Sequence, residues 1–159
     1  MEKIPLSKDK FMRGLIAGFI AGLIKDIPSV TAHLFQWDVF PTYWDYSGMI
    51  AFGKVPHTAT DIMIAIIVEV VFSMAIGAIL VHVISKIKSH HYLIAGAFSG
   101  AGVWFFIRAT MWILDVKKFN QPQMLAFIIN AATSIGYGLL IAYLDKLLQK
   151  AGNRSSNGF

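Results

Sequence analysis

Cysteine is absent from this 159-residue chain, which excludes disulfides, thiolate metal sites and cysteine nucleophiles. Charge is also scarce: 14% of the residues are charged, whereas soluble domains average about 25%. The chain is instead 56% hydrophobic, with a mean hydropathy of +0.60. The sequence contains no nucleophile elbow, phosphate-binding loop or zinc-protease helix. The composition therefore predicts one membrane domain that is not an enzyme.

Four apolar segments are long enough to cross a membrane as helices, at about residues 11–35, 62–84, 92–114 and 123–145. We expect an all-α protein with a four-helix transmembrane domain over residues 1–150 and a flexible tail over residues 151–159. Lys25, Asp26 and Pro28 interrupt the first segment. That segment either crosses with a break there, which would expose carbonyls beside two charges, or ends near Ile24 and continues along the interface.

The basic residues predict the orientation of the chain. Most of them lie before or at the start of the first segment, between the second and third, or after the fourth: Lys3, Lys8, Lys10, Arg13, Lys86, Lys88, Lys146, Lys150 and Arg154. By the positive-inside rule these regions are cytoplasmic. We therefore expect a multi-pass protein of the cell (inner) membrane with both termini in the cytoplasm. The net charge of +5 is scattered over helix ends, which does not indicate a nucleic-acid partner.

Five strongly polar residues lie inside the apolar segments: Lys25, Asp26, Glu69, Arg108 and Asn130. With a rise of 1.5 Å per residue, all of them fall within roughly 8 Å of the membrane midplane, in its outer half. Charges at this depth are costly, so they usually face a partner or a water-filled cavity. The shared depth predicts one polar layer, whose four charges sum to zero.

Each of the four apolar segments carries a stripe of residues spaced four apart, most of them small. The stripes contain Gly14, Gly18, Gly22 and Asp26; Glu69, Ser73 and Gly77; Gly96, Gly100, Trp104 and Arg108; and Asn130, Ser134 and Gly138. Small residues at this spacing let helix backbones approach closely. We therefore assign the glycines to helix packing, and expect the polar members of the stripes, with Lys25, to face the helix interfaces.

The stripes also indicate an internal repeat. Residues 15–22 echo residues 93–100, and the Glu69, Ser73, Gly77 pattern echoes Asn130, Ser134, Gly138. Either the chain contains two duplicated helical hairpins of equal topology, or glycine-rich helices match here by chance. In a duplication, a site would be expected at the interface of the two repeats.

The polar layer could act in two ways. An unpaired Glu69 would suit proton coupling, whereas a Glu69 paired with Arg108 or Lys25 would be a structural strut. Arg108 could bind an anion or carboxylate, and the Trp104 ring could face a cation. Both residues fit structural roles equally well. Ser73 and Ser134 complete the predicted ion- or substrate-binding set of Lys25, Asp26, Glu69, Trp104, Arg108 and Asn130.

Aromatic residues gather between the first two segments, at Trp37, Phe40, Tyr43, Trp44, Tyr46 and Phe52. Aromatics favour the headgroup level, which predicts an interfacial helix or cap on the outer side, or a lid over the polar layer. His33 and His82 fall in opposite leaflets, so they cannot ligate one haem iron. We predict no cofactor and no metal site.

The order of the segments, the aromatic outer loop and the short basic cytoplasmic turn resemble small four-helix inner-membrane proteins of Gram-positive bacteria, a family of uncharacterised function. The resemblance transfers no role to any residue. We expect a small channel or transporter that passes an ion or small polar solute through the polar layer. The alternative is a non-transporting membrane subunit or scaffold. The expected partners are membrane lipid, further copies of the chain, and a protein in the membrane that binds the glycine-rich faces.

Overall fold

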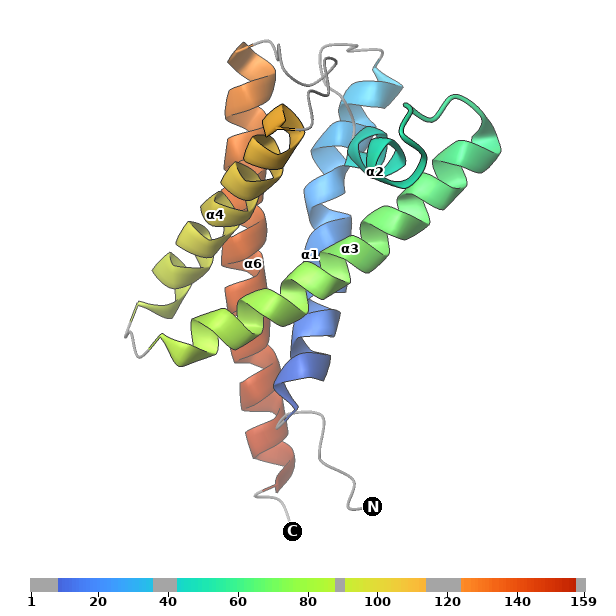
Figure 1. Cartoon of the computed structure of the whole chain (residues 1–159). Helices are drawn as coiled ribbons and strands as arrows, with labels where there is room; N and C mark the ends of the chain where they lie inside the picture. The colour runs from blue at the N-terminus through green and yellow to red at the C-terminus, as the bar shows by residue number, and fades with distance from the viewer. Residues whose placement is uncertain (1–8, 36–42, 88–90, 114–123, 157–159) are drawn as a thin grey trace.

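Helices account for all the regular secondary structure in the part of the chain that the computed structural model describes, residues 9–35, 43–87, 91–113 and 124–156. Five helices are present there: α1 (Lys10–Leu34), α2 (Tyr43–Phe52), α3 (Ala59–Lys86), α4 (Tyr92–Ile113) and α6 (Met124–Ser156). The four long helices alternate in direction, so the start of α1 and the end of α6 lie at the same end of the molecule (Figure 1). The all-α prediction is confirmed.

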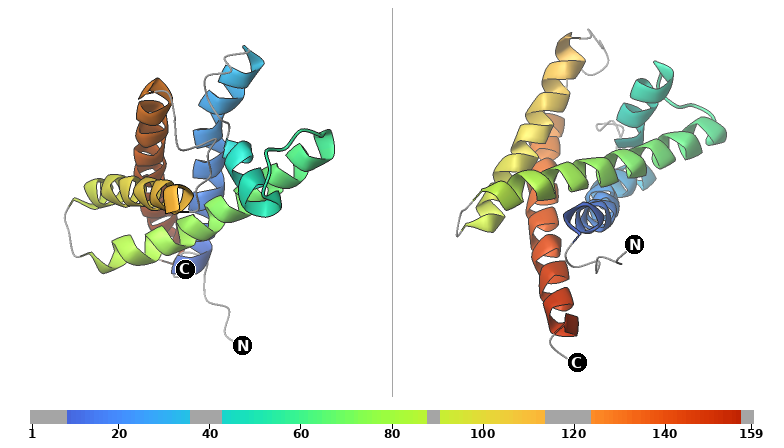
Figure 2. Two further views of the ribbon diagram at one scale, coloured as in Figure 1. Left: turned by 45° about the horizontal axis from the view of Figure 1, so that its top comes forward. Right: turned by 60° about the horizontal axis from the view of Figure 1, so that its bottom comes forward.

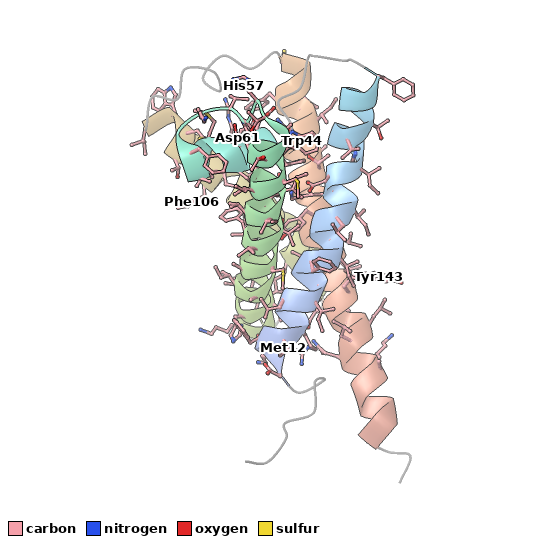
Figure 3. The ribbon with its side chains drawn as sticks, turned by 90° about the vertical axis from the view of Figure 1, so that its right-hand side faces the viewer. Met12, Trp44, His57, Asp61, Phe106 and Tyr143 are labelled. Atoms are coloured by element: carbon pink, nitrogen blue, oxygen red, sulfur yellow. The ribbon has the colours of Figure 1, made fainter. Side chains whose placement is uncertain are left out.

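Three of the described helices are long and apolar enough to cross a membrane: Ala59–Lys86, Tyr92–Ile113 and the Phe127–Ala151 part of α6. Their outer faces are strongly apolar. On α4, Phe98 is 82% exposed and Phe106 is 72% exposed, and Figure 3 shows Phe106 and Tyr143 on the outside of the helices. Large apolar surfaces of this kind mark contact with a membrane or a partner.

Local signals explain where two of the helices begin. The Asp9 carboxylate accepts hydrogen bonds from the backbone N–H groups of Phe11 (2.9 Å) and Met12 (3.2 Å) at the start of α1. Thr58 is the N-cap of α3 and accepts from the N–H of Asp61 at 3.1 Å. Both side chains satisfy backbone donors that have no partner within the helix.

Helix α1 is continuous through Pro28. It therefore does not end near Ile24, which was one of the two expectations for this segment. Proline lacks the N–H that would bond to the Ile24 carbonyl oxygen, but the loss of this one hydrogen bond does not end the helix. Thr31 Oγ1 donates to the carbonyl oxygen of Ile27 at 2.8 Å in the next turn.

Helices α1 and α3 form one closely packed pair, and α4 and α6 form another (Figure 2). In the first pair, a Cβ added to Gly77 would lie 2.5 Å from the Cα of Gly18. In the second pair, a Cβ added to Gly138 would lie 2.8 Å from the Cα of Gly100. Real Cβ atoms do not approach other atoms this closely, so only glycine permits these backbone distances.

The predicted packing glycines all lie in these two contacts: Gly14, Gly18, Gly22 and Gly77 between α1 and α3, and Gly96, Gly100 and Gly138 between α4 and α6. The two pairs meet mainly through α1 and α6. Their joint core lies toward the end where α1 begins, and contains Ala17, Ala21, Leu80, Val81, Ile84, Tyr137, Ile141 and Ala142.

Helix α6 continues to Ser156, into the segment expected to be a flexible tail. The sequence there is polar. Polarity alone therefore does not end the helix at Lys150.

Candidate functional site

A cavity of about 80 Å³ lies among all five helices. This volume accommodates a few water molecules or a small solute, since about 10–15 Å³ suffices for one water. It is well below the roughly 300–1,000 Å³ of pockets for drug-sized ligands. Seven residues of the predicted binding set line it, namely Lys25, Glu69, Ser73, Trp104, Arg108, Asn130 and Ser134.

Asp26 is the member of the predicted set that does not line the cavity. It is instead part of an ion cluster with Lys25 and Glu69. The Lys25 ammonium donates to Asp26 Oδ1 at 2.9 Å and also to Glu69 Oε1. The Lys25 and Glu69 side chains are 9% and 8% exposed. The shared depth predicted from the sequence thus brings these three charges into contact.

The Glu69 carboxylate has further donors besides Lys25. Ser47 of α2 donates to Oε2, and Ser73, one turn along α3, donates to Oε1 at 3.2 Å. A buried charge is tolerable only when it is paired and hydrogen-bonded. Glu69 meets both conditions, so this arrangement matches the strut with Lys25 and not the unpaired proton-coupling group.

Lys25 also contacts aromatic rings. Its ammonium nitrogen lies 3.9 Å from the centroid of the Tyr43 ring and 5.8 Å from that of Tyr137. The first distance is typical of a cation–π contact, which strengthens when water is excluded. Tyr137 in turn donates from its hydroxyl to the Ser73 carbonyl oxygen at 2.6 Å, which ties α6 to α3 beside the cavity.

The opposite wall of the cavity carries Arg108 and Trp104 from α4. The guanidinium carbon of Arg108 lies 5.9 Å from the centroid of the Phe127 ring. Trp104 packs edge-on against the same ring, with centroids 4.8 Å apart. The indole Nε1 of Trp104 is buried, and among the described residues it has no hydrogen-bond partner. A buried donor left in this state costs about 1–3 kcal/mol.

Helix α2 contributes Tyr43, Tyr46 and Ser47 to the lining. The Tyr43 hydroxyl hydrogen-bonds with Thr133 Oγ1, and Asn130 Nδ2 donates to the Tyr46 hydroxyl at 3.5 Å. Burial raises the pKa of Tyr46, while the nearby Arg108 opposes the shift. Tyr46 therefore keeps its proton at neutral pH. Of the other aromatics expected in this region, Trp37 and Phe40 lie outside the described residues.

A second polar cluster lies in the opposite half of the molecule, and the sequence reasoning did not identify it. Asp145 of α6 is completely buried and Arg13 of α1 is 4% exposed. The Arg13 Nε donates to Asp145 Oδ1 at 2.7 Å. Tyr92 of α4 and Gln149 of α6 donate to Asp145 Oδ2, the latter at 2.7 Å. This cluster joins three helices through one carboxylate.

A sequence signal for the second cluster does exist. Arg13, Ala17, Ala21 and Lys25 form a stripe with four-residue spacing, and both alanines are fully buried. The stripe thus places one cation at each end of a small-residue face. The positive-inside rule uses Arg13 only as a signal of orientation.

His82 Nδ1 lies 3.1 Å from the carbonyl oxygen of Ala78, a contact within its own helix. Within the described ranges, no three His, Asp or Glu side chains gather in a way that could hold a metal ion.

Comparison of the chain with models of protein families, with curated proteins and with solved structures finds no match.

Proposed function

We propose that the chain is a small integral membrane channel or transporter that passes an ion or small polar solute through the buried polar layer. One observation carries this proposal: the small cavity is lined by Lys25, Glu69 and Arg108 from three different helices. Charged groups in membrane segments are expensive and mark ion or substrate pathways. A merely structural ion cluster does not require a cavity beside it.

The proposal includes four membrane spans, with α1 as the fourth. Helix α1 has 25 residues and is about 37 Å long at 1.5 Å per residue, which exceeds a hydrocarbon core of about 30 Å. The start of α1 and the end of α6 lie at the same end of the bundle (Figure 1), and the flanking sequence on both sides is basic. This end is the cytoplasmic one in the proposal, and α2 then lies on the outer side as a lid over the cavity.

Passage would require a conformational change toward the cytoplasmic end. The core cluster, with Ala21, Val81 and Ile141, occupies that half of the bundle, and the Arg13–Asp145 pair lies at its far end. The proposed solute would therefore have no passage toward that end in this conformation, and α1 and α6 would have to separate to release it there.

We further propose that the two helix pairs arose by duplication. Gly77 faces the Gly14 carbonyl oxygen and the Gly18 Cα, and Gly138 faces the Gly96 carbonyl oxygen and the Gly100 Cα. These contacts align the first segment with the third, but one helical turn away from the alignment that the sequence echo gives. In the contact register Asp26 corresponds to Arg108, and Glu69 to Asn130. The cavity would then lie between two related halves.

The alternative function is a non-transporting subunit or scaffold. The predicted packing glycines are used within the chain, so a partner would need other small-residue positions. Gly102 and Gly136 offer such positions, because a Cβ added to either would meet open space. Gly136 also lines a largely apolar groove of about 480 Å³ together with Ala21, Leu93 and Leu140. Further copies of the chain could bind there.

Ion flux in liposomes tests the proposal. Purified protein should carry flux above that of empty liposomes under at least one gradient of proton, sodium, potassium or chloride. Glu69→Gln should change this flux by about tenfold or more, since it removes the charge that pairs with Lys25. Asp61→Asn is the matched control, because Asp61 lies outside the cavity lining and pairs with the exposed Lys54 at 3.7 Å.

Two results would contradict the proposal, the first by removing transport and the second by removing the role of Glu69. The first is the absence of flux under all four gradients with protein shown to be folded, which would favour the scaffold. The second is equal flux in the Glu69→Gln and Asp61→Asn variants, which would remove Glu69 from any pathway.

A further inference from the structure

An apolar groove of about 540 Å³ lies between α1 and α3, in the half of the bundle where α1 begins. Apart from His82 its lining is apolar, and the residues that define it are Phe11 and Leu15 of α1 and Val71, Ala75, Ile79 and Val83 of α3. The side chains of Phe11, Val71 and Ile79 are 54%, 60% and 56% exposed. The groove is therefore open to the surroundings of the bundle.

The length of the groove matches one leaflet of a membrane. Val71 and Val83 lie twelve positions apart on α3, which is about 18 Å at 1.5 Å per residue. Half of a hydrocarbon core of about 30 Å measures about 15 Å. A transmembrane helix of a second copy, packed lengthwise along α3, would need a groove about twice as long. The dimension therefore favours the acyl chain of a lipid.

Two lysines lie at the end of this groove where α1 begins. Lys10 directly precedes Phe11, and its ammonium donates to Ser85 Oγ at 3.3 Å, which places it beside the last turn of α3. Lys86 lies in that turn, four positions after His82 and thus on the same face of the helix. Both lysines are exposed. The groove is therefore apolar along its length and basic at one end.

The charges at this end do not cancel. Lys10 and Lys86 contribute two positive charges, and within the described part of the chain neither forms an ion pair. Asp9 contributes one negative charge, but its carboxylate accepts from the N–H groups of Phe11 and Met12, where the helix dipole is positive. This end of the groove is therefore complementary to an anionic group.

We propose that the groove between α1 and α3 binds an anionic phospholipid of the cytoplasmic leaflet, with an acyl chain along the apolar part and the phosphate at Lys10 and Lys86. Basic sites between transmembrane helices on the cytoplasmic side recognise acidic headgroups. The leaflet follows from the proposed orientation of the chain. The binding does not depend on the proposed transport, so a protein without flux would still bind the lipid.

Native mass spectrometry of the full chain in detergent tests the proposal, because it counts bound lipids and reads the oligomeric state together. Phosphatidylglycerol and phosphatidylcholine with identical acyl chains differ in headgroup charge. Glycerol 3-phosphate serves as a competitor that has the phosphate and lacks the acyl chains. We expect phosphatidylglycerol to bind about tenfold more tightly than phosphatidylcholine, and glycerol 3-phosphate not to displace it.

A pair of lysine variants locates the headgroup. Lys10→Gln combined with Lys86→Gln should weaken the binding of phosphatidylglycerol about tenfold. Lys146→Gln combined with Lys150→Gln is the matched control, because it removes two exposed cations of α6 from the same end of the bundle. The control should change the affinity by less than about twofold if the lysines beside the groove form a defined site.

A pair of alanine variants locates the acyl chain. Ala75 is exposed and lines the groove, so Ala75→Phe should fill the groove and weaken the binding of phosphatidylglycerol. Ala132→Phe is the matched control, because Ala132 is an exposed alanine of α6 outside this lining. Circular dichroism checks that the variants are folded, and Ala75→Leu provides a smaller side chain should Ala75→Phe not fold.

Four results would overturn the inference. Equal affinity for the two lipids, or equal losses in the two double-lysine variants, would assign the preference to a diffuse basic surface. Displacement by glycerol 3-phosphate would indicate a site for free phosphate. Unchanged binding in the folded Ala75 variant would remove the acyl chain from the groove. A dimer that dissociates in this variant would assign the groove to a second copy of the chain.

Discussion

Asp145 is a single residue whose carboxylate bonds to side chains from three helices. Its side chain is completely buried, and it accepts hydrogen bonds from Arg13, Tyr92 and Gln149. Glu69 differs because its cation, Lys25, has a second carboxylate in Asp26. Loss of the Glu69 charge therefore leaves Lys25 paired, whereas loss of the Asp145 charge leaves Arg13 buried without this carboxylate.

Asp145→Asn should destabilise the fold by about 3–5 kcal/mol, the usual cost of removing one partner of a buried ion pair. Tyr92→Phe is the control, because it removes one donor to the same carboxylate and should cost about 0.5–3 kcal/mol. Denaturant unfolding in detergent, followed by circular dichroism, measures both. Equal stability of the two variants would show that the Arg13 charge does not depend on Asp145.

At the level of the helices, glycine positions decide which faces meet. Gly100 and Gly102 lie two residues apart on α4, but only Gly100 is in contact with another helix. A Cβ at Gly100 would lie 3.1 Å from the Cα of Gly138 and would overlap the Ser134 carbonyl oxygen, whereas a Cβ at Gly102 would meet nothing within 4 Å. A comparison of substitutions at these two glycines therefore separates the effect of close packing on stability from the effect of helix propensity.

Gly100→Ala should therefore lower the unfolding temperature, because α4 and α6 would have to separate. Gly102→Ala should leave it unchanged or raise it, since alanine favours a helix over glycine by about 0.5–1 kcal/mol. Thermal unfolding of both variants in the same detergent makes the comparison. A loss of stability in Gly102→Ala as large as that in Gly100→Ala would contradict the packing shown here.

The helices differ in how far the sequence predicts them. Helices α3 and α4 follow directly from long apolar runs, whose length alone indicates a span. Helix α6 extends past its apolar run to Ser156, because a helix that has already formed propagates through polar residues at little cost. Helix α1 was ambiguous, since Pro28 disfavours a helix locally while packing against α3 favours it over the whole length.

The sequence likewise predicts some parts of the candidate site and not others. The four-residue stripes predicted the faces on which Glu69, Arg108 and Asn130 lie, so their convergence on one cavity has a sequence signal. Helix α2 was expected as an interfacial helix or cap, or as a lid over the polar layer, but nothing in its composition identifies Ser47 as the partner of Glu69. Pairing across 132 positions, as between Arg13 and Asp145, depends on which helices become neighbours, which a single sequence does not encode locally.

For the whole molecule, the absence of native cysteine makes the proposed orientation directly testable. Lys54 follows α2 and its side chain is 63% exposed, whereas Lys86 lies in the last turn of α3 at the other end of the bundle. In intact cells, a membrane-impermeant maleimide should label Lys54→Cys and not Lys86→Cys. Labelling of Lys86→Cys alone would invert the topology, and permeabilised cells confirm that both thiols can react.

One face of α1 connects the two polar clusters. Arg13 and Lys25 lie on the same stripe, twelve positions apart, with the buried Ala17 and Ala21 between them, which places the two cations about 18 Å apart along the helix. A helix is stiff over this length, so turning α1 about its axis moves Arg13 away from Asp145 and Lys25 away from Glu69 together. Rotation of α1 would therefore act on both polar clusters at once, although they lie in opposite halves of the bundle.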